Sequence, residues 1–163
     1  MSLVTVRRFT VATADEMRDL GAMLGRTCRA SDVIVLTGDL GAGKTTFTQG
    51  LAVGLGIDEA VTSPTFVIAR VHPSAGAGPD LVHVDAYRLG SAVELDELDL
   101  EADLNRSVVV VEWGGGLVGG LAETPIDVSI VRSDDEADET RTVTVSALGN
   151  QWETALADGE SIT

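Results

Sequence analysis

The stretch that decides the fold is Val33-Ile34-Val35-Leu36-Thr37-Gly38-Asp39-Leu40-Gly41-Ala42-Gly43-Lys44-Thr45. Its first four residues form a continuous apolar run, which is typical of a central strand buried on both faces. Residues 38–45 match the pattern G-x-x-x-x-G-K-[ST] in full. Beyond them, Phe47, Leu51 and Leu55 recur at helical spacing. The motif therefore lies between a strand and a helix, which is the context that a phosphate-binding loop requires.

Each part of this loop has a chemical task. Glycines let backbone N–H groups wrap around phosphate oxygens, and the helix that follows offers its positive N-terminus. We expect Lys44 to neutralise the β- and γ-phosphates and the hydroxyl of Thr45 to reach Mg²⁺. The loop predicts a nucleoside triphosphate and Mg²⁺ as ligands, with an ordinary glycine turn as the alternative. The candidate nucleotide-binding residues here are Asp39, Leu40, Gly41, Ala42, Gly43, Lys44, Thr45 and Thr46.

Two further apolar runs, Leu81 to Asp85 and Val108 to Glu112, each end in an acid. In open α/β sheets ligands bind at the carboxyl ends of the strands. Asp85 resembles the Walker B acid that reaches Mg²⁺ through water, and a capping Asp is the alternative. Glu112 is a candidate to orient or deprotonate an attacking water, and pairing with an arginine such as Arg88 explains it equally well. The candidate metal ligands are Thr45, Asp85 and Glu112.

Four side chains outside the loop and these strand ends have both a functional and a structural interpretation. Thr65 follows a proline. In P-loop nucleoside triphosphatases, a residue of this type senses the γ-phosphate through its hydroxyl or amide. An ordinary turn residue is an equal alternative. Trp113 is a candidate to stack on a base or seal the site, or else to pack. His72 and His83 lack partners at metal-ligand spacing, which favours solvent or core histidines. The candidate catalytic residues are Lys44, Thr65, Asp85 and Glu112.

The order of elements predicts an α/β fold, a three-layer sandwich like that of P-loop nucleoside triphosphatases, with a mostly parallel central sheet and antiparallel edge strands. We expect one domain over residues 1–150 and a flexible tail over residues 151–163. A capping box at residues 13–16 opens a helix whose role is packing. The other predicted elements are strands at Val4–Phe9, Val67–Val71, Ile126–Val131 and Thr142–Ala147, and an amphipathic helix at Glu94–Asp103.

Composition limits the partners and the compartment. With 44% hydrophobic and 23% charged residues, the 163-residue chain is an ordinary globular protein. Its 26 acids against 11 bases give a net charge of −15, which argues against autonomous binding to nucleic acid. Two acidic runs, one within Glu94–Asp103 and one at Asp134–Glu139, indicate solvated surface, or docking to a basic partner. A single cysteine, Cys28, and no membrane-length apolar stretch predict a cytoplasmic protein without a membrane partner.

The nucleotide base can be inferred from one residue. Lys44 is the only lysine in the chain, so the Asn/Thr-Lys-x-Asp element that GTPases use to select guanine cannot be present, and ATP is favoured. A small-molecule kinase is one alternative, but such kinases usually need several arginines and a lid, and only Arg70 and Arg88 lie near the expected site. A nucleotide-switched binding module with negligible turnover is the other alternative.

Four blocks together carry a resemblance to one family. They are Gly38–Thr46, Ser63-Pro64-Thr65-Phe66, His83-Val84-Asp85-Ala86-Tyr87-Arg88-Leu89 and Val111-Glu112-Trp113. In this order and spacing they resemble the bacterial TsaE (YjeE) family over about residues 10 to 150. The last three blocks are not shared by P-loop proteins generally, so the set is far more specific than any one block.

The resemblance implies a Mg-dependent ATPase needed to make threonylcarbamoyladenosine in tRNAs that read codons starting with A. It implies TsaD-like and TsaB-like partners, whose complex the ATPase resets between turnovers, weak turnover without them, and tRNA reached only through them. By position, Lys44 and Thr45 then hold phosphate and Mg²⁺, Asp85 is the Walker B acid, and Thr65 lies in a switch-like segment. Glu112 and Trp113 form the signature near the catalytic water and nucleotide.

Two positions depart from the family's pattern. The chain has the small Ala86 where a larger apolar residue is usual, and Gly114-Gly115-Gly116 where an acid often follows the tryptophan. The second departure puts in doubt any role for a carboxylate just beyond Trp113.

Overall fold

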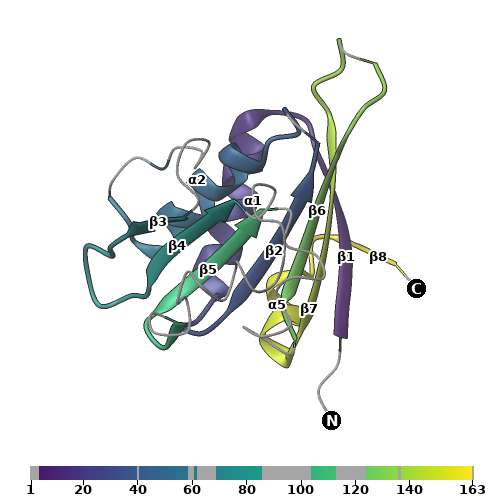
Figure 1. The fold of residues 1–163 in the computed structure, drawn as a ribbon. Helices are drawn as coiled ribbons and strands as arrows, with labels where there is room; N and C mark the ends of the chain where they lie inside the picture. The colour runs from purple at the N-terminus through teal and green to yellow at the C-terminus, as the bar shows by residue number, and fades with distance from the viewer. Residues whose placement is uncertain are drawn as a thin grey trace.

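The computed structural model describes residues 4–39, 41–58, 61, 69–85, 104–112, 124–135 and 137–162. Within them, one sheet has the strand order β3-β4-β5-β2-β6-β7-β1-β8 (Figure 1). The strands are β1 Val4–Val11, β2 Val33–Gly38, β3 Ala69–His72, β4 Asp80–Asp85, β5 Ser107–Glu112, β6 Ile126–Arg132, β7 Arg141–Leu148 and β8 Glu160–Ser161. The helices are α1 Ala14–Thr27, α2 Lys44–Leu55 and α5 Asn150–Ala155.

The centre of the sheet is parallel. Strands β4, β5, β2 and β6 lie side by side in parallel pairs, whereas β3 and β7 join them from either flank as antiparallel strands. The apolar run at the start of β2 is at most 3% exposed, and the four valines of β5 are fully buried. Such continuous burial is what parallel strands covered on both faces require. The predicted α/β fold with a parallel centre and antiparallel edges is confirmed.

The antiparallel part of the sheet follows a different pattern of burial. In β7, Val143, Val145 and Ala147 are buried and alternate with half-buried polar residues, which is typical of a sheet with only one face on the core. Strand β1 is longer than expected. It does not form the edge, because β8 pairs with it through Arg7 and Arg8.

Helices α1 and α2 pack against each other on one face of the sheet (Figure 1). Leu24 of α1 and Phe47 and Leu51 of α2 are fully buried in this core. The helices approach so closely that a Cβ added at Gly50 would lie 2.1 Å from the carbonyl oxygen of Arg18. This tight packing fixes the axis of α2 and therefore the place of its N-terminus beside the end of β2.

The predicted capping box opens α1 as expected. The Thr13 hydroxyl accepts a hydrogen bond from the Glu16 N–H at 3.1 Å, and the Glu16 carboxylate accepts one from the Ala12 N–H at 2.7 Å. Met17, Leu20 and Leu24 then lie on the buried face of the helix. The sequence therefore located both the start of this helix and its packing face.

The end of the chain differs from the expected flexible tail over residues 151–163. Helix α5 places Trp152 in the main core at 1% exposure, and Leu156 is fully buried beside it. These two apolar side chains are four residues apart and lie on one face of the segment. Their burial stabilises the segment by more than the conformational entropy that it loses on ordering. Strand β8 then pairs with β1.

Two other expectations reach beyond the described residues. The amphipathic helix expected at Glu94–Asp103, and with it the second helical layer of a three-layer sandwich, lies outside them. Of the strand expected at Val67–Val71, only the part from Ala69 is described, and it belongs to β3. In the part of the chain that is described, no helix is both long and apolar enough to cross a membrane.

Candidate functional site

The glycine-rich loop leaves the end of β2 and turns tightly into α2. Gly41 and Gly43 have φ angles of +80° and +112°, a region that costs glycine little and other residues more. The Ala42 N–H donates to the Asp39 carbonyl at 2.9 Å, and the Ala42 side chain is fully buried. Leu40 lies outside the described residues. The glycines thus allow a backbone shape that the motif predicts.

The N-terminus of α2 is open to an anion. Its N-cap, Gly43, has no side chain to accept a hydrogen bond, and the first turn contains no acid. The first amides of a helix have no acceptor within the helix and lie at the positive end of its dipole. The Lys44 ammonium reaches back across the loop and donates to the Gly38 carbonyl. Thr45 and Thr46 lie half-buried in the same turn.

Asp85 and Glu112 lie next to each other at one edge of the sheet. They are register partners on the parallel strands β4 and β5, and Glu112 also opposes Leu36 of β2. Register partners on adjacent strands lie about 4.8 Å apart and project from the same face. That face is the one that carries α2, because Leu36 and Val110 on it belong to the helix-side core. Both carboxylates therefore stand beside the start of the loop.

Glu112 has a neighbour that the sequence did not predict. His83 of β4 is fully buried, and its Nε2 lies 3.5 Å from Oε2 of Glu112, which is itself only 5% exposed. The alternative partner, Arg88, is outside the described residues. His72 and His83 are both buried, as expected of core histidines. The spacing of His83 and Asp85, two residues apart, places both on one face of their strand, but the contact with Glu112 depends on the register between β4 and β5.

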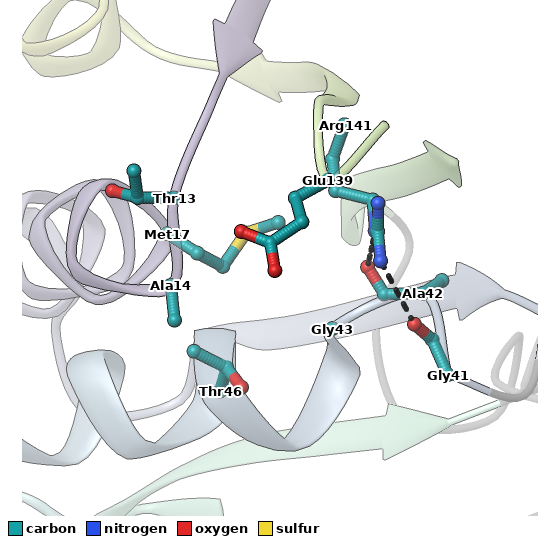
Figure 2. A pocket seen from close by; sticks show the side chains of 9 residues that line it. All are labelled: Thr13, Ala14, Met17, Gly41, Ala42, Gly43, Thr46, Glu139 and Arg141. Carbon is teal, nitrogen blue, oxygen red and sulfur yellow. Dashed lines mark hydrogen bonds between the residues drawn. The ribbon is translucent and has the colours of Figure 1, made fainter. Parts of the chain in front are cut away.

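A pocket opens on the other side of the loop, between the N-termini of α1 and α2 and the β6–β7 hairpin. Its volume is about 220 Å³. Figure 2 shows both residues of the hairpin side, with Glu139 directed toward Met17 of α1 and Arg141 directed toward Gly41 and Ala42 of the loop. Arg141 donates from Nε to the Ala42 carbonyl at 3.1 Å and from a terminal nitrogen to the Gly41 carbonyl at 3.4 Å. The lining residues are Thr13, Ala14, Met17, Gly41, Ala42, Gly43, Thr46, Glu139 and Arg141.

Sequence reasoning missed most of this pocket. Its walls come from residues 13–17, 41–46 and 139–141, which are far apart in the chain and share no motif. Helix α1 was expected to serve packing only, yet its first turn forms one wall. Glu139 ends an acidic run that was interpreted as solvated surface. No periodicity or spacing in the sequence indicates that these segments meet.

The remaining candidates are placed as follows. Thr65 and Trp113 lie outside the described residues. Among the residues that are described, no three His, Cys, Asp or Glu side chains gather into a metal-binding group. The oxygen donors near the loop are the Thr45 hydroxyl and the carboxylates of Asp85 and Glu112. Burial raises the pKa of the Cys28 thiol well above its usual range, so this cysteine stays protonated in the core.

Comparisons with known proteins agree on one family. The family model "Threonylcarbamoyl adenosine biosynthesis protein TsaE" matches residues 11–143. A Streptomyces coelicolor protein named tRNA threonylcarbamoyladenosine biosynthesis protein TsaE is 58% identical over 141 residues, 85% of this chain and 95% of the relative. A Bacillus subtilis protein of the same name is 35% identical over 147 residues, 90% of this chain and 89% of the relative.

The fold agrees as well. The solved structure titled "Crystal structure of Bacillus subtilus YdiB" superposes with a TM-score of 0.71 at 29% identity, covering 96% of this chain and 95% of that one. The glycine-rich loop and the strand-end pair Asp85 and Glu112 all fall within the matched residues. The chain belongs to the TsaE family and acts in the biosynthesis of threonylcarbamoyladenosine in tRNA.

Proposed function

We propose that this chain binds Mg-ATP at the glycine-rich loop and hydrolyses it to ADP and phosphate as its contribution to tRNA modification. One observation carries the proposal: the uncapped, acid-free N-terminus of α2 begins beside two strand-end carboxylates that lie in register. Helix amides and a lysine at such a place favour the phosphates of a nucleotide. The neighbouring carboxylates suit the metal and the attacking water.

The phosphate side of the site has a donor set that fits Mg²⁺. Mg²⁺ prefers oxygen ligands and is usually held by one or two carboxylates together with substrate phosphates. The Thr45 hydroxyl and Asp85 are the protein ligands in this proposal, and Glu112 is a third candidate. When bound, Mg²⁺ offsets charge that develops on the phosphates.

Hydrolysis then needs a group that acts on water. Glu112 is the candidate, because its carboxylate stands at the strand end and is nearly excluded from solvent. The water oxygen attacks the γ-phosphorus, the bond to the β-phosphate oxygen breaks, and the carboxylate orients the water and receives its proton. Lys44 supplies positive charge to the β- and γ-phosphates. Thr65 is the residue proposed to sense the γ-phosphate.

The pocket beside the loop suits the nucleoside half of ATP. At about 220 Å³ it is smaller than the roughly 300–1,000 Å³ of sites that enclose a whole drug-sized ligand, so it fits only part of a nucleotide. Glu139 repels phosphate but accepts hydrogen bonds from an amino group or from ribose hydroxyls. Arg141 braces the loop backbone through the Gly41 and Ala42 carbonyls. Trp113 is the proposed stacking or sealing residue for the base.

The proposed partners are a TsaD-like and a TsaB-like protein. Hydrolysis by this chain resets their complex between turnovers, and tRNA is reached through that complex. A net charge of −15 supports this division of labour, because sequence-independent affinity for nucleic acid comes mainly from Lys and Arg. The chain is therefore expected to turn over ATP weakly alone and faster with its partners.

The deciding experiment measures ADP and inorganic phosphate released from Mg-ATP, with and without the TsaB-like and TsaD-like pair. Equal amounts of ADP and phosphate, and a rate raised by the partners, are expected. ADP formed without phosphate would point to a kinase. Tight ATP binding without turnover in the full mixture would point to a nucleotide-switched module. GTP should compete poorly with ATP.

The nucleoside pocket has its own test. Ala14 is exposed on the pocket wall, so Ala14→Phe fills the cavity without disturbing the core, and Ala14→Ser is the matched control. We expect Ala14→Phe to weaken ATP binding about tenfold or more while tripolyphosphate binds as in the unmodified chain. Unchanged ATP affinity in Ala14→Phe would place the nucleoside elsewhere.

A further inference from the structure

One buried polar side chain near the site is unexplained by packing. His83 has no exposed surface, and neither of its ring nitrogens makes a hydrogen bond to the described residues. Burying a polar group without a partner costs free energy that an apolar side chain of similar size avoids. The inward positions around it on β4 and β5 are apolar, namely Leu81, Val108 and Val110. A histidine at this place is therefore retained at a cost.

The geometry directs the ring toward one atom. His83 opposes Val110 in register, and the next inward pair toward the sheet edge is Asp85 and Glu112. His83 and Glu112 are thus diagonal neighbours on adjacent strands. The His83 Nε2 is 3.5 Å from Oε2 of the Glu112 carboxylate. This separation is slightly longer than an ordinary hydrogen bond. Hydrogen bonds in empty catalytic sites are often long and tighten only when substrate binds.

We propose that His83 is a positioning residue for Glu112, donating from Nε2–H to Oε2 so that the other carboxylate oxygen faces the attacking water. The proposal rests on the hydrolysis of ATP proposed above. A buried carboxylate with one oxygen held by a donor cannot rotate freely, so the second oxygen keeps one direction. His83 touches neither the nucleotide nor the water, and it acts only through Glu112.

The first test uses variants that separate hydrogen bonding from size. His83→Phe keeps a ring but removes the donor, whereas His83→Gln places an amide N–H near the position of Nε2. With Mg-ATP and the partner pair, we expect kcat of His83→Phe to fall about tenfold or more with KM for ATP unchanged. His83→Gln should recover most of the rate. Equal rates in the unmodified chain and His83→Phe, or equal losses in Phe and Gln, would overturn the proposal.

A double-variant cycle tests whether His83 acts through Glu112. If it does, His83→Phe combined with Glu112→Gln is no slower than Glu112→Gln alone. Independent, multiplying losses would show a separate role and overturn the proposal. Should His83→Phe fail to fold by thermal unfolding, His83→Asn and His83→Gln replace it, because only Gln carries its amide near Nε2.

The second readout does not depend on turnover. The chain has only two histidines, so a His83→Gln variant assigns the ¹⁵N ring signals of His83 by difference. We expect a proton on Nε2, and a ring that carries a proton on Nδ1 but none on Nε2 overturns the proposal. If the unmodified chain releases no phosphate with its partners, the proposed function fails and this inference falls with it. If it turns over ATP while His83→Phe matches its rate, only the inference fails.

Discussion

Helices α1 and α2 both begin at the pocket beside the loop, but their N-termini are built differently (Figure 2). At α1, the Thr13 hydroxyl and the Glu16 carboxylate accept hydrogen bonds from backbone amides, and Asp15 adds negative charge to the first turn. At α2, Gly43 provides no side-chain cap and no acid follows. Side chains therefore cap the N-terminus of α1, whereas the N-terminus of α2 has no side-chain cap.

Under the proposed function, this difference separates a structural helix end from one that binds phosphate. A side-chain cap contributes about 1 kcal/mol to stability, so α2 gives up that amount in the free protein. What it retains is a set of amides and a positive dipole end directed at the site beside Asp85 and Glu112. Three predictions test this contrast, beginning with the largest effect, and a fourth concerns a carboxyl group away from both helix ends.

Lys44→Ala should abolish the binding function of the α2 terminus. The chain has no other lysine, and removing a preorganised charge from such a site typically lowers rates about 100-fold or more. Calorimetric ATP affinity and phosphate release are the measurements. Val53→Ala, at a 70% exposed position on the same helix, is the control and should match the unmodified chain. Unchanged affinity and rate in Lys44→Ala would remove the loop from the proposed site.

Thr46→Glu should make the α2 terminus resemble that of α1. An acid in the first turn stabilises a helix by about 0.3–1 kcal/mol, so the free protein should melt at a higher temperature. The same charge repels phosphate, and we expect ATP to bind about tenfold more weakly. Thr46→Gln has the shape of Thr46→Glu without the charge. Any effect of side-chain size in the pocket therefore appears in both variants, and the difference between them measures the effect of the charge. Tighter ATP binding in Thr46→Glu would contradict the proposed position of the phosphates.

Thr13→Ala should damage α1 without damaging the site. Losing the hydrogen bond from the Glu16 N–H to the Thr13 hydroxyl costs about 1 kcal/mol of folding free energy. Because that hydroxyl is already engaged, ATP affinity of the folded variant should stay within about twofold of the unmodified chain. Chemical denaturation and calorimetry measure the two quantities, and Thr13→Ser, which keeps the cap, is the control. A large loss of affinity would mean that Thr13 contacts the ligand directly.

The smallest effect is expected for Asp32→Asn, just before β2 and at the end of that strand opposite the loop. Burial raises the pKa of Asp32. The Arg29 N–H donates to the Asp32 carboxylate at 2.8 Å and partly offsets this rise. Because the folded pKa lies above the unfolded one, wild-type stability falls as pH rises from about the ordinary value of 3.8 through the folded pKa. Asp32→Asn avoids this loss and should be more stable at neutral pH. Partial exposure screens the charge and keeps the gain below about 1 kcal/mol.

Denaturation curves at neutral and acidic pH check this, since the difference between Asp32→Asn and the unmodified chain should vanish well below the ordinary Asp pKa. ATP turnover at neutral pH should be the same in both proteins. A gain that persists at low pH would assign the effect to packing and not to charge.

Local patterns were enough for most of the fold. The start of α1 followed from a capping box, and the loop followed from a complete motif. The buried strands β2 and β5 followed from unbroken apolar runs, and β4 from an apolar run that contains His83. These signals depend on residues close together in the chain, where sterics and hydrogen bonding act without the rest of the molecule. The burial of Trp152 and Leu156 was not predicted, because the contribution of these two side chains to stability depends on a core that other segments build.

The sequence by itself determined the glycine-rich loop, its lysine, and the two acids at strand ends, because each is encoded within a run of about ten residues. Only the tertiary structure decided that Asp85 and Glu112 share a register, that His83 lies beside Glu112, and that Thr13 and Arg141 line one pocket. Those neighbours are set by strand order and by helix packing. Both are long-range properties, and no local spacing in this chain encodes them.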